Sequence, residues 1–186
     1  MQARQAYIAG DVEKCGEILR RESAAGDPNC QTFLGTLYQD GLPGFDKDVW
    51  RAVKLYEQAA EQQNLLGTYM LGQTYFRGLG VKRDKKKGAR LIKRAALMNL
   101  PEAQAMLYEV FRRPFRRKVA TAWLLVAAEN GDQQSVERLQ GARVSNGSRE
   151  IAGRILNLIK SLHLLKTLNP VAGLKRLDEL ELEDIR

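Results

Sequence analysis

The chain has 186 residues, 44% of them apolar and 28% charged, with a formal net charge of +8 at pH 7. This length can bury the core of one domain. No apolar stretch reaches the roughly 18 residues needed to span a bilayer, and the N-terminus shows no signal-peptide hydrophobic region. The positive excess favours acidic partners such as nucleic acid, an anionic membrane or an acidic protein surface.

Residues 3–25 predict two helices, which are separated by a turn at Gly10-Asp11 and followed by the turn sequence 26–28. The helical pattern has already started at residues 1–4, which suggests that a segment upstream, such as a signal or lipoprotein leader, has been removed. We therefore expect the protein in the periplasm if such a leader existed, and in the cytoplasm otherwise.

The chain has two cysteines, Cys15 and Cys30, which could form a disulfide or part of a metal site. The helix register places them at opposite ends of antiparallel helices, on the order of 20 Å apart. A disulfide needs Cα atoms within about 7 Å of each other. We therefore predict that both cysteines are small buried residues.

Residues 29–40 predict the next helix, which is followed by a lengthened turn and a helix capped by Asp48. The same arrangement returns over residues 71–96, where glycines allow the chain to leave one helix and Asp84 caps the next. A third copy over residues 107–128 has Pro114 in place of the turn glycine, and we expect its turn to be irregular.

Self-similarity fixes the register of these hairpins. Leu34-Gly35, Tyr38 and Gly41 recur 37 residues later as Leu71-Gly72, Tyr75 and Gly78. The alanine pairs 59–60, 95–96 and 127–128 follow one another at intervals of 36 and 32 residues. The phase holds from about Asp11 to Ala142, which predicts helix hairpins stacked in one row.

The pattern Leu-Gly-x-x-Tyr-x-x-Gly-x-Gly-Val-x-x-Asp with an Ala-Ala close resembles the Sel1-like repeat family. The match is clearest over residues 71–96, partial over 34–60 and 107–128, and weak over 11–25 and 132–142. The resemblance implies an all-α fold: a right-handed α/α solenoid of hairpins related to tetratricopeptide arrays. We predict that this solenoid occupies residues 1–147.

After Ala142 the phase is lost, and residues 144–147 predict a loop with Ser148 as the cap of the next helix. Residues 151–165 carry an amphipathic stripe, Pro170 breaks it, and a last helix covers 171–180. We interpret residues 148–186 as C-terminal capping helices that cover the last repeat. A dimerisation or partner-binding helix is the alternative.

No catalytic constellation is evident. His163 stands on a helix among leucines, and one histidine with two distant cysteines cannot supply the ligands of a zinc site. The glycines at 78 and 80 with the lysines after them do not form a phosphate-binding loop, because a helix precedes them and no Ser or Thr follows Lys87-Gly88. We therefore predict no enzyme activity, no metal and no cofactor.

What remains is binding, and stacked first helices of such hairpins line the concave face that receives partners. The register places there the residues Gln31, Thr68, Tyr69, Gln73, Gln104 and Glu109. Two basic clusters, 82–87 and 112–118, fall on turns, and we expect them to form one basic ridge. Its candidate binding residues are Arg83, Lys86, Arg112, Arg113, Arg116 and Arg117.

The resemblance implies a non-enzymatic protein–protein interaction module. Sel1-like proteins serve as assembly scaffolds and signalling regulators, and some small bacterial members resemble immunity proteins that neutralise type VI secretion effectors, including phospholipases. The strong net charge suits an immunity or inhibitor protein that meets acidic groups on a toxin. The alternatives are a bacterial adaptor scaffold or a nucleic-acid-binding helical repeat. The basic residues gather at turns and not at repeated base-reading positions, which disfavours the last of these.

Overall fold

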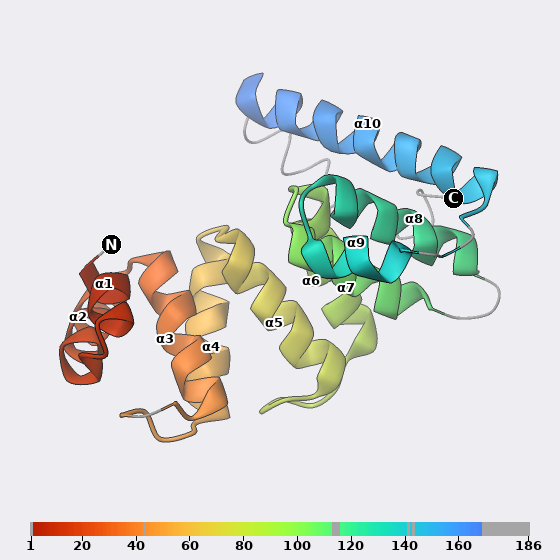
Figure 1. Cartoon of the computed structure of the whole chain (residues 1–186). Coiled ribbons are helices and arrows are strands. Elements are labelled where there is room, and N and C mark those ends of the chain that lie inside the picture. The colour runs from red at the N-terminus through yellow and green to blue at the C-terminus, as the bar shows by residue number, and fades with distance from the viewer. Residues whose placement is uncertain (1, 43, 113–115, 141, 143, 169–186) are drawn as a thin grey trace. The chain divides into compact units, whose positions relative to one another are not determined.

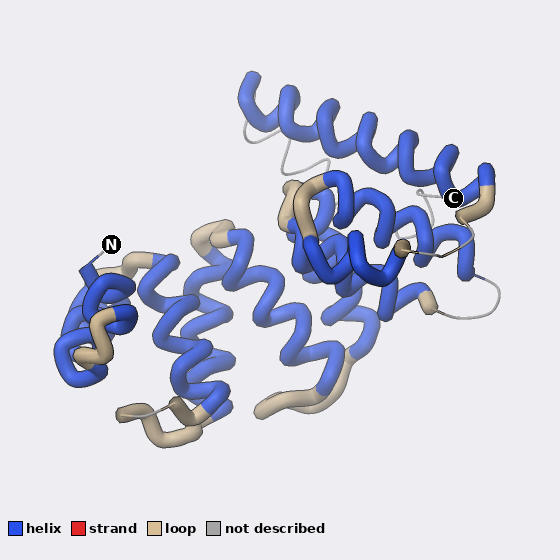
Figure 2. Tube along the Cα trace, viewed as in Figure 1, coloured by secondary structure: helices blue, strands red, loops and turns tan. Residues whose placement is uncertain are grey.

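In the computed structural model, the described residues are 2–42, 44–112, 116–140, 142 and 144–168. Across these ranges the chain forms ten helices and no strand (Figure 2). This confirms the prediction of an all-α fold built from helix hairpins. The chain divides into two compact units, residues 1–88 and 89–186. The predicted division at residue 147 stays a prediction.

Unit 1 contains α1 (Gln2–Ile8), α2 (Val12–Ala24), α3 (Pro28–Asp40), α4 (Val49–Glu61), α5 (Leu65–Arg77) and the first residues of α6 (Lys85–Leu97). Helix α3 packs against α2, α4 and α5, and α4 also packs against α5 (Figure 1). Successive hairpins are therefore stacked side by side, as the 37-residue register requires.

The core of this unit combines apolar residues with glycines at places where two helices approach closely. Cys15, Leu19, Leu34, Leu37 and Phe45 are buried together. A Cβ atom on Gly35 of α3 would lie 2.6 Å from Cε1 of Tyr56 in α4. Because that distance is shorter than a van der Waals contact, the Leu-Gly pair of the repeat is needed for the helices to pack.

The second helix of each of the first three hairpins starts with a capping aspartate. The backbone N–H groups of Lys14, Arg51 and Lys87 donate to Asp11, Asp48 and Asp84 at 3.1, 2.9 and 2.9 Å. The predicted caps at Asp48 and Asp84 are confirmed. The first helices α3 and α5 are capped in the same way by Asp27 and Asn64.

The turns depend on residues with positive φ at two repeated positions. Gly41 and Gly78, at the ends of α3 and α5, have φ of 68° and 79°, which only glycine adopts without strain. The turn between hairpins has positive φ at Gly26, Gln63, Asn99 and Gly131, with values of 96°, 62°, 71° and 93°. The spacing of these four residues follows the repeat, and Gln63 adopts the left-handed conformation at a cost that a glycine would avoid.

Unit 2 contains the rest of α6, α7 (Pro101–Phe111), α8 (Arg117–Glu129), α9 (Gln133–Leu139) and α10 (Asn146–Leu168). Helix α8 packs against α7, α9 and α10, and it buries Trp123, Leu124 and Val126. The predicted stripe on α10 is confirmed at Ile155, Ile159 and Leu162, which are buried, whereas Ile151 and Leu158 are half-buried. Pro170 and the helix predicted over residues 171–180 lie outside the described residues.

The predicted start of α10 is wrong by three residues. The helix begins at Asn146, so Asn146 and Gly147 belong to it and not to a loop. Ser145 occupies the capping position, because its Oγ accepts a hydrogen bond from the Ser148 N–H at 3.2 Å. The Ser148 hydroxyl is buried and lies 2.9 Å from Ser145 Oγ. The prediction chose Ser148 because a serine before a helical pattern indicates an N-cap, and Ser145 fits that signal equally well.

The fourth hairpin, α7–α8, which is the third copy of the sequence repeat, lacks the capping hydrogen bonds of the first three. Leu100 and Arg116 precede its two helices, and neither makes a side-chain capping hydrogen bond. Its turn, with Pro114, lies outside the described residues.

Both cysteines are free thiols, as predicted, and Cys15 is buried. Cys30 is only half-buried, so the prediction of full burial is wrong for it. Desolvation, and then the nearby charge of Asp27, raise the pKa of Cys30 to about 11. The thiolate, which is the reactive form, is therefore scarce at neutral pH.

Candidate functional site

Within the described residues, no group of three or more His, Cys, Asp and Glu side chains is placed to hold a metal ion. His163 is exposed on α10. No helix in the described ranges is long and apolar enough to cross a membrane. The candidate sites assigned from the sequence are expected at surface positions on the stacked helices.

Three of the predicted partner-binding residues are buried, so the prediction that they lie on an accessible face is wrong. Gln31, Thr68 and Gln104 are at most 5% exposed. Gln31 Nε2 donates to the Ser23 carbonyl at 3.4 Å, and Gln31 Oε1 accepts from Gln62 Nε2 at 2.9 Å. This side chain therefore joins α3 to the ends of the two neighbouring helices.

Gln104 has the corresponding role in unit 2. Its Nε2 donates to the Ala96 carbonyl at 3.0 Å, and its Oε1 accepts from Asn130 Nδ2 at 3.0 Å. Thr68 donates to the Asn64 carbonyl one helical turn earlier, at 2.8 Å. These residues share a register position, as predicted. That position satisfies polar groups of the turns between hairpins and does not point outwards.

Tyr69 and Gln73 lie one turn apart on α5. Gln73 Nε2 donates to the Tyr69 hydroxyl, Tyr69 is buried, and Gln73 is half-buried. Binding of a partner by this pair stays a prediction.

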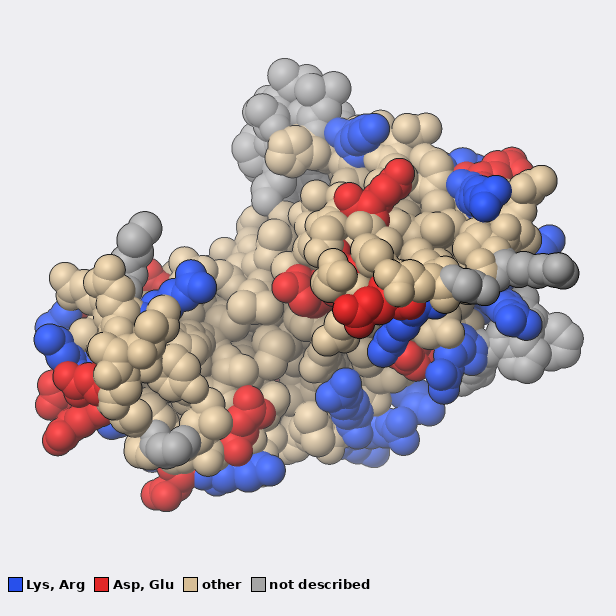
Figure 3. All heavy atoms as spheres, in the orientation of Figure 1, with Lys and Arg blue, Asp and Glu red and all other residues tan. Residues whose placement is uncertain are grey.

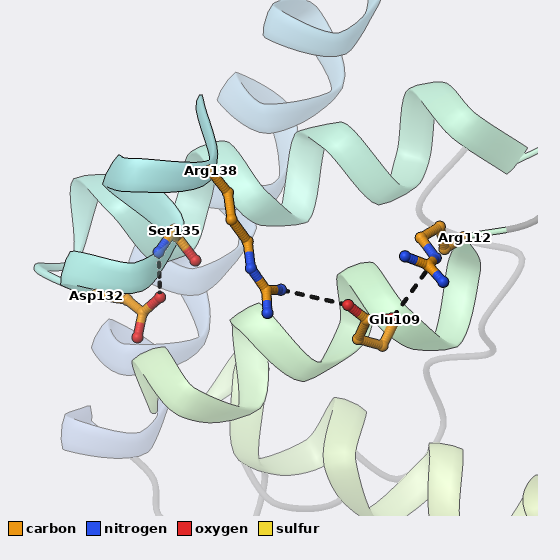
Figure 4. Close-up of polar contacts among 5 residues, drawn as sticks. All are labelled: Glu109, Arg112, Asp132, Ser135 and Arg138. Atoms are coloured by element: carbon orange, nitrogen blue, oxygen red, sulfur yellow. Dashed lines mark hydrogen bonds and ion pairs between the residues drawn. The ribbon is translucent and has the colours of Figure 1, made fainter. Parts of the chain in front are cut away.

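Glu109 is exposed on α7 and lies between two arginines (Figure 4). Arg138 Nη1 of α9 is 3.3 Å from one carboxylate oxygen, and Arg112 Nε is 3.6 Å from the other. Asp132 caps α9 beside them by accepting from the Ser135 N–H at 2.7 Å. Glu109 therefore contributes to the contact between α7 and α9, although exposed pairs of this kind stabilise by only about 0–1 kcal/mol.

The remaining predicted residues are basic. Arg83 is exposed at the turn before α6, where its Nε donates to the Phe76 carbonyl at 3.1 Å. Lys86 is exposed in the first turn of α6 itself, so the prediction that its cluster lies on a turn is wrong for Lys86. In unit 2, Arg117 is exposed, while Arg116 is half-buried with its guanidinium 5.8 Å from the centre of the Phe111 ring. Arg113 lies outside the described residues. Because the two clusters belong to different units, one continuous ridge stays a prediction.

The sequence analysis did not identify a groove of about 470 Å³ in unit 1. Arg4, Tyr7 and Ile8 of α1 form one wall. The other residues come from α3 and the start of α5: Asn29, Thr32, Phe33, Thr36, Asn64 and Leu66. In Figure 3 the middle of the visible face of this unit is mostly uncharged, with charged side chains at its margins.

The walls of the groove are apolar and exposed. Ile8 is 74%, Leu66 45% and Tyr7 39% exposed. The Tyr7 ring meets Phe33 edge-on, with ring centres 5.7 Å apart. Single exposed apolar residues are common on protein surfaces, but several around one concavity mark a binding site.

The sequence contained a partial signal for this groove. Thr36 of the groove stands at the same repeat position as Gln73 and Glu109, which were predicted to face a partner. In α3, however, the positions that face the groove include 29, 33 and 36, and the chosen position 31 points into the stack. The wall from α1 precedes the region where the repeat pattern is strong.

The Sel1 repeat family model matches residues 28–64 and 66–100. These segments correspond to the hairpins α3–α4 and α5–α6, each with its following turn. A solved Sel1 repeat protein from Oxalobacter formigenes is 27% identical and superposes with a TM-score of 0.62, covering 72% of this chain and 56% of its own.

The chain contains two Sel1 repeats.

Two curated relatives share part of the sequence. Protein SHC1 of Saccharomyces cerevisiae is 36% identical over 101 residues, which is 54% of this chain and 19% of that protein. Chitin synthase regulatory factor 3 of Schizosaccharomyces pombe is 28% identical over 117 residues, which is 60% of this chain and 13% of that protein. This Sel1-like chain therefore spans less than a fifth of the length of these relatives.

Sel1 repeat proteins are generally protein-interaction scaffolds, and the prediction of a protein-interaction module is confirmed at that level. The groove is formed partly by the matched Sel1 repeats and partly by the helix that precedes them. Its residues on α3 and α5 fall within the matched repeats, and its residues on α1 precede them.

Proposed function

We propose that this Sel1-like chain is a non-enzymatic binding module, and that the groove of unit 1 receives a segment of a partner protein. The observation that carries the proposal is the group of exposed apolar side chains around the groove, above all Ile8 and Leu66. Complete burial of one such side chain stabilises a complex by about 1.5–3 kcal/mol. Two or three of them supply the anchors that dominate protein interfaces.

The basic clusters have a supporting role in this proposal. Lys86 is exposed at the start of α6, and Arg117 is exposed at the start of α8. Exposed cations accelerate association with an acidic surface and make the rate depend on salt, but they add little to the final affinity. We therefore assign the affinity to the groove and the steering of the partner to the cations.

The experiment compares two leucines of unit 1. Leu66 lies in the groove and is 45% exposed, whereas Leu79 lies at the turn after α5, outside the groove lining, and is 37% exposed. Partners are captured on the full chain, identified by mass spectrometry, and titrated against Leu66→Asp and Leu79→Asp. We expect Leu66→Asp to weaken binding by tenfold or more, or about 1.4 kcal/mol, and Leu79→Asp to leave it nearly unchanged. Equal effects of the two substitutions would remove the groove from the proposal.

The identity of the partner is a narrower proposal. An antibacterial effector fits the net charge of +8 if the toxin presents acidic groups. Its test is whether expression of this chain protects cells from that effector, and whether the purified chain inhibits it at equimolar concentration. A regulatory scaffold is the alternative, and the name of the Schizosaccharomyces pombe relative supports it.

Nucleic acid is the least favoured partner. Binding to arbitrary RNA or DNA that weakens steeply with salt would support it. A stoichiometric protein complex that persists at moderate salt would exclude nucleic acid as the main partner.

A further inference from the structure

The polar groups of the groove indicate which chemistry its ligand carries. The lining contains one charged residue, Arg4, and no carboxylate. The Arg4 guanidinium makes no ion pair or hydrogen bond with any other residue that the structure describes. Residues three and four apart on a helix share a face, so Arg4 stands beside Tyr7 and Ile8 on the groove side of α1.

The polar side chains that α3 and α5 place in the groove mostly form hydrogen bonds with each other or with nearby backbone, and one amide N–H donor has no partner among the described residues. Asn64 Nδ2 donates to Asn29 Oδ1 at 2.9 Å, and Asn64 Oδ1 accepts from the Gly67 N–H at 2.8 Å. Asn29 Nδ2 donates to no other described residue. The groups available to a ligand are therefore the Arg4 guanidinium and the Tyr7 hydroxyl on α1 and an amide donor on α3. All three can donate to an acceptor, and the guanidinium and the amide N–H can do nothing else.

We propose that the groove selects an amphipathic peptide segment in which apolar side chains are flanked by Asp or Glu. The apolar side chains enter between Ile8, Phe33 and Leu66, a carboxylate of the segment pairs with Arg4, and a backbone carbonyl accepts from Asn29. This inference rests on the proposed function and names the class of partner segment. A polybasic segment is excluded by Arg4, and a nucleic acid finds only one cation for its phosphates.

The experiment uses the full chain and a fluorescent probe peptide of about 15 residues, long enough for four helical turns. The probe has leucine at every third or fourth position and glutamate between the leucines. One comparison peptide replaces each glutamate by lysine, and another replaces each leucine by serine. Fluorescence anisotropy gives the dissociation constants. We expect the Leu/Glu peptide to bind at least tenfold more tightly than either comparison peptide.

Charge reversal isolates Arg4. Arg4→Glu should weaken binding of the Leu/Glu peptide about tenfold and strengthen binding of the Leu/Lys peptide. Lys54→Glu is the matched control, because Lys54 is exposed on α4, lies outside the groove lining, and changes the net charge equally. Equal responses of the two variants would mean that only the overall charge matters, and would overturn the inference. Circular dichroism checks that both variants keep the wild-type fold.

Two further outcomes would overturn the inference in distinguishable ways. A long-chain fatty acid also combines apolar groups with a carboxylate, and displacement of the peptide by that acid at comparable or lower concentration would show that the groove is a lipid site. If no peptide binds but Leu66→Asp still abolishes partner capture, the proposed function stands and the acidic-peptide inference fails. If Leu66→Asp also has no effect, both fail.

Discussion

The hairpins α3–α4 and α7–α8 share a repeat register but depend on different interactions. The first has capping hydrogen bonds at both helix starts, from Asp27 and Asp48. The second has none at Leu100 or Arg116, but α8 packs against three helices and buries Trp123 completely. The comparison teaches that tertiary packing can maintain a repeat whose local signals have been lost.

The largest expected effect tests that packing. Trp123→Ala should lower the free energy of unfolding by about 3–5 kcal/mol, because it leaves a large cavity in unit 2. Urea unfolding followed by circular dichroism measures it. Trp123→Phe is the control. It should cost much less, since it leaves a smaller cavity and removes the buried indole N–H, which has no hydrogen-bond partner among the described residues. A loss for Trp123→Ala no larger than that of a missing cap would contradict the comparison.

A smaller loss of stability is expected when a helix cap is removed, and its dependence on pH should differ between the caps at Asp27 and Asn64. The backbone N–H of Cys30 and then other hydrogen bonds hold the pKa of Asp27 below its usual value, despite some desolvation. A carboxyl whose pKa is lowered on folding stabilises above its unfolded-state pKa, and this stability is lost as pH falls through the folded-state pKa. Asp27→Ala should therefore cost about 1 kcal/mol at neutral pH and progressively less in acid.

Asn64 is the uncharged counterpart of Asp27 in the next hairpin. Its amide oxygen caps α5 in place of a carboxylate. Asn64→Ala should destabilise by an amount that does not change between neutral and acidic pH, because an amide does not titrate in that range. Thermal melts of both alanine variants across pH 3 to 7 compare the two caps. Parallel curves would mean that the Asp27 charge contributes nothing.

The smallest effect concerns the turn between hairpins. Gln63 adopts φ of 62° where Gly26 and Gly131 occupy the same repeat position. Gln63→Gly should raise the free energy of unfolding by about 0.5–1 kcal/mol, because relief of about 1–2 kcal/mol of left-handed strain exceeds the roughly 0.5–1 kcal/mol of extra chain entropy that a glycine loses on folding. Gly131→Gln, the reverse change in unit 2, should lower it by a similar amount. A destabilising Gln63→Gly would show that the loss of chain entropy outweighs the relief of strain.

The features that the sequence predicted well are local ones. Caps at Asp48 and Asp84 and the turn at Gly78 depend on a few neighbouring residues, so their spacing was sufficient to find them. The start of α10 was misplaced because Ser145 and Ser148 give the same capping signal.

The solvent exposure of individual side chains was harder to predict, because it depends on which parts of neighbouring helices and turns pack against them. Gln31 and Gln104 are polar and regularly spaced, which is typical of a binding face, yet the turns between hairpins bury them. The groove was not identified because Tyr7 on its α1 wall and Phe33 on α3 are 26 positions apart in the sequence, and nothing local links them.

The location of the α1 wall of the groove has a consequence for how binding specificity can evolve. Arg4, Tyr7 and Ile8 belong to a seven-residue helix that precedes the segments recognised as Sel1 repeats. Mutation or replacement of this one short helix would alter what the groove accepts and leave the stacked scaffold unchanged. Homologues with well-matched repeats but different first helices should therefore bind different ligands.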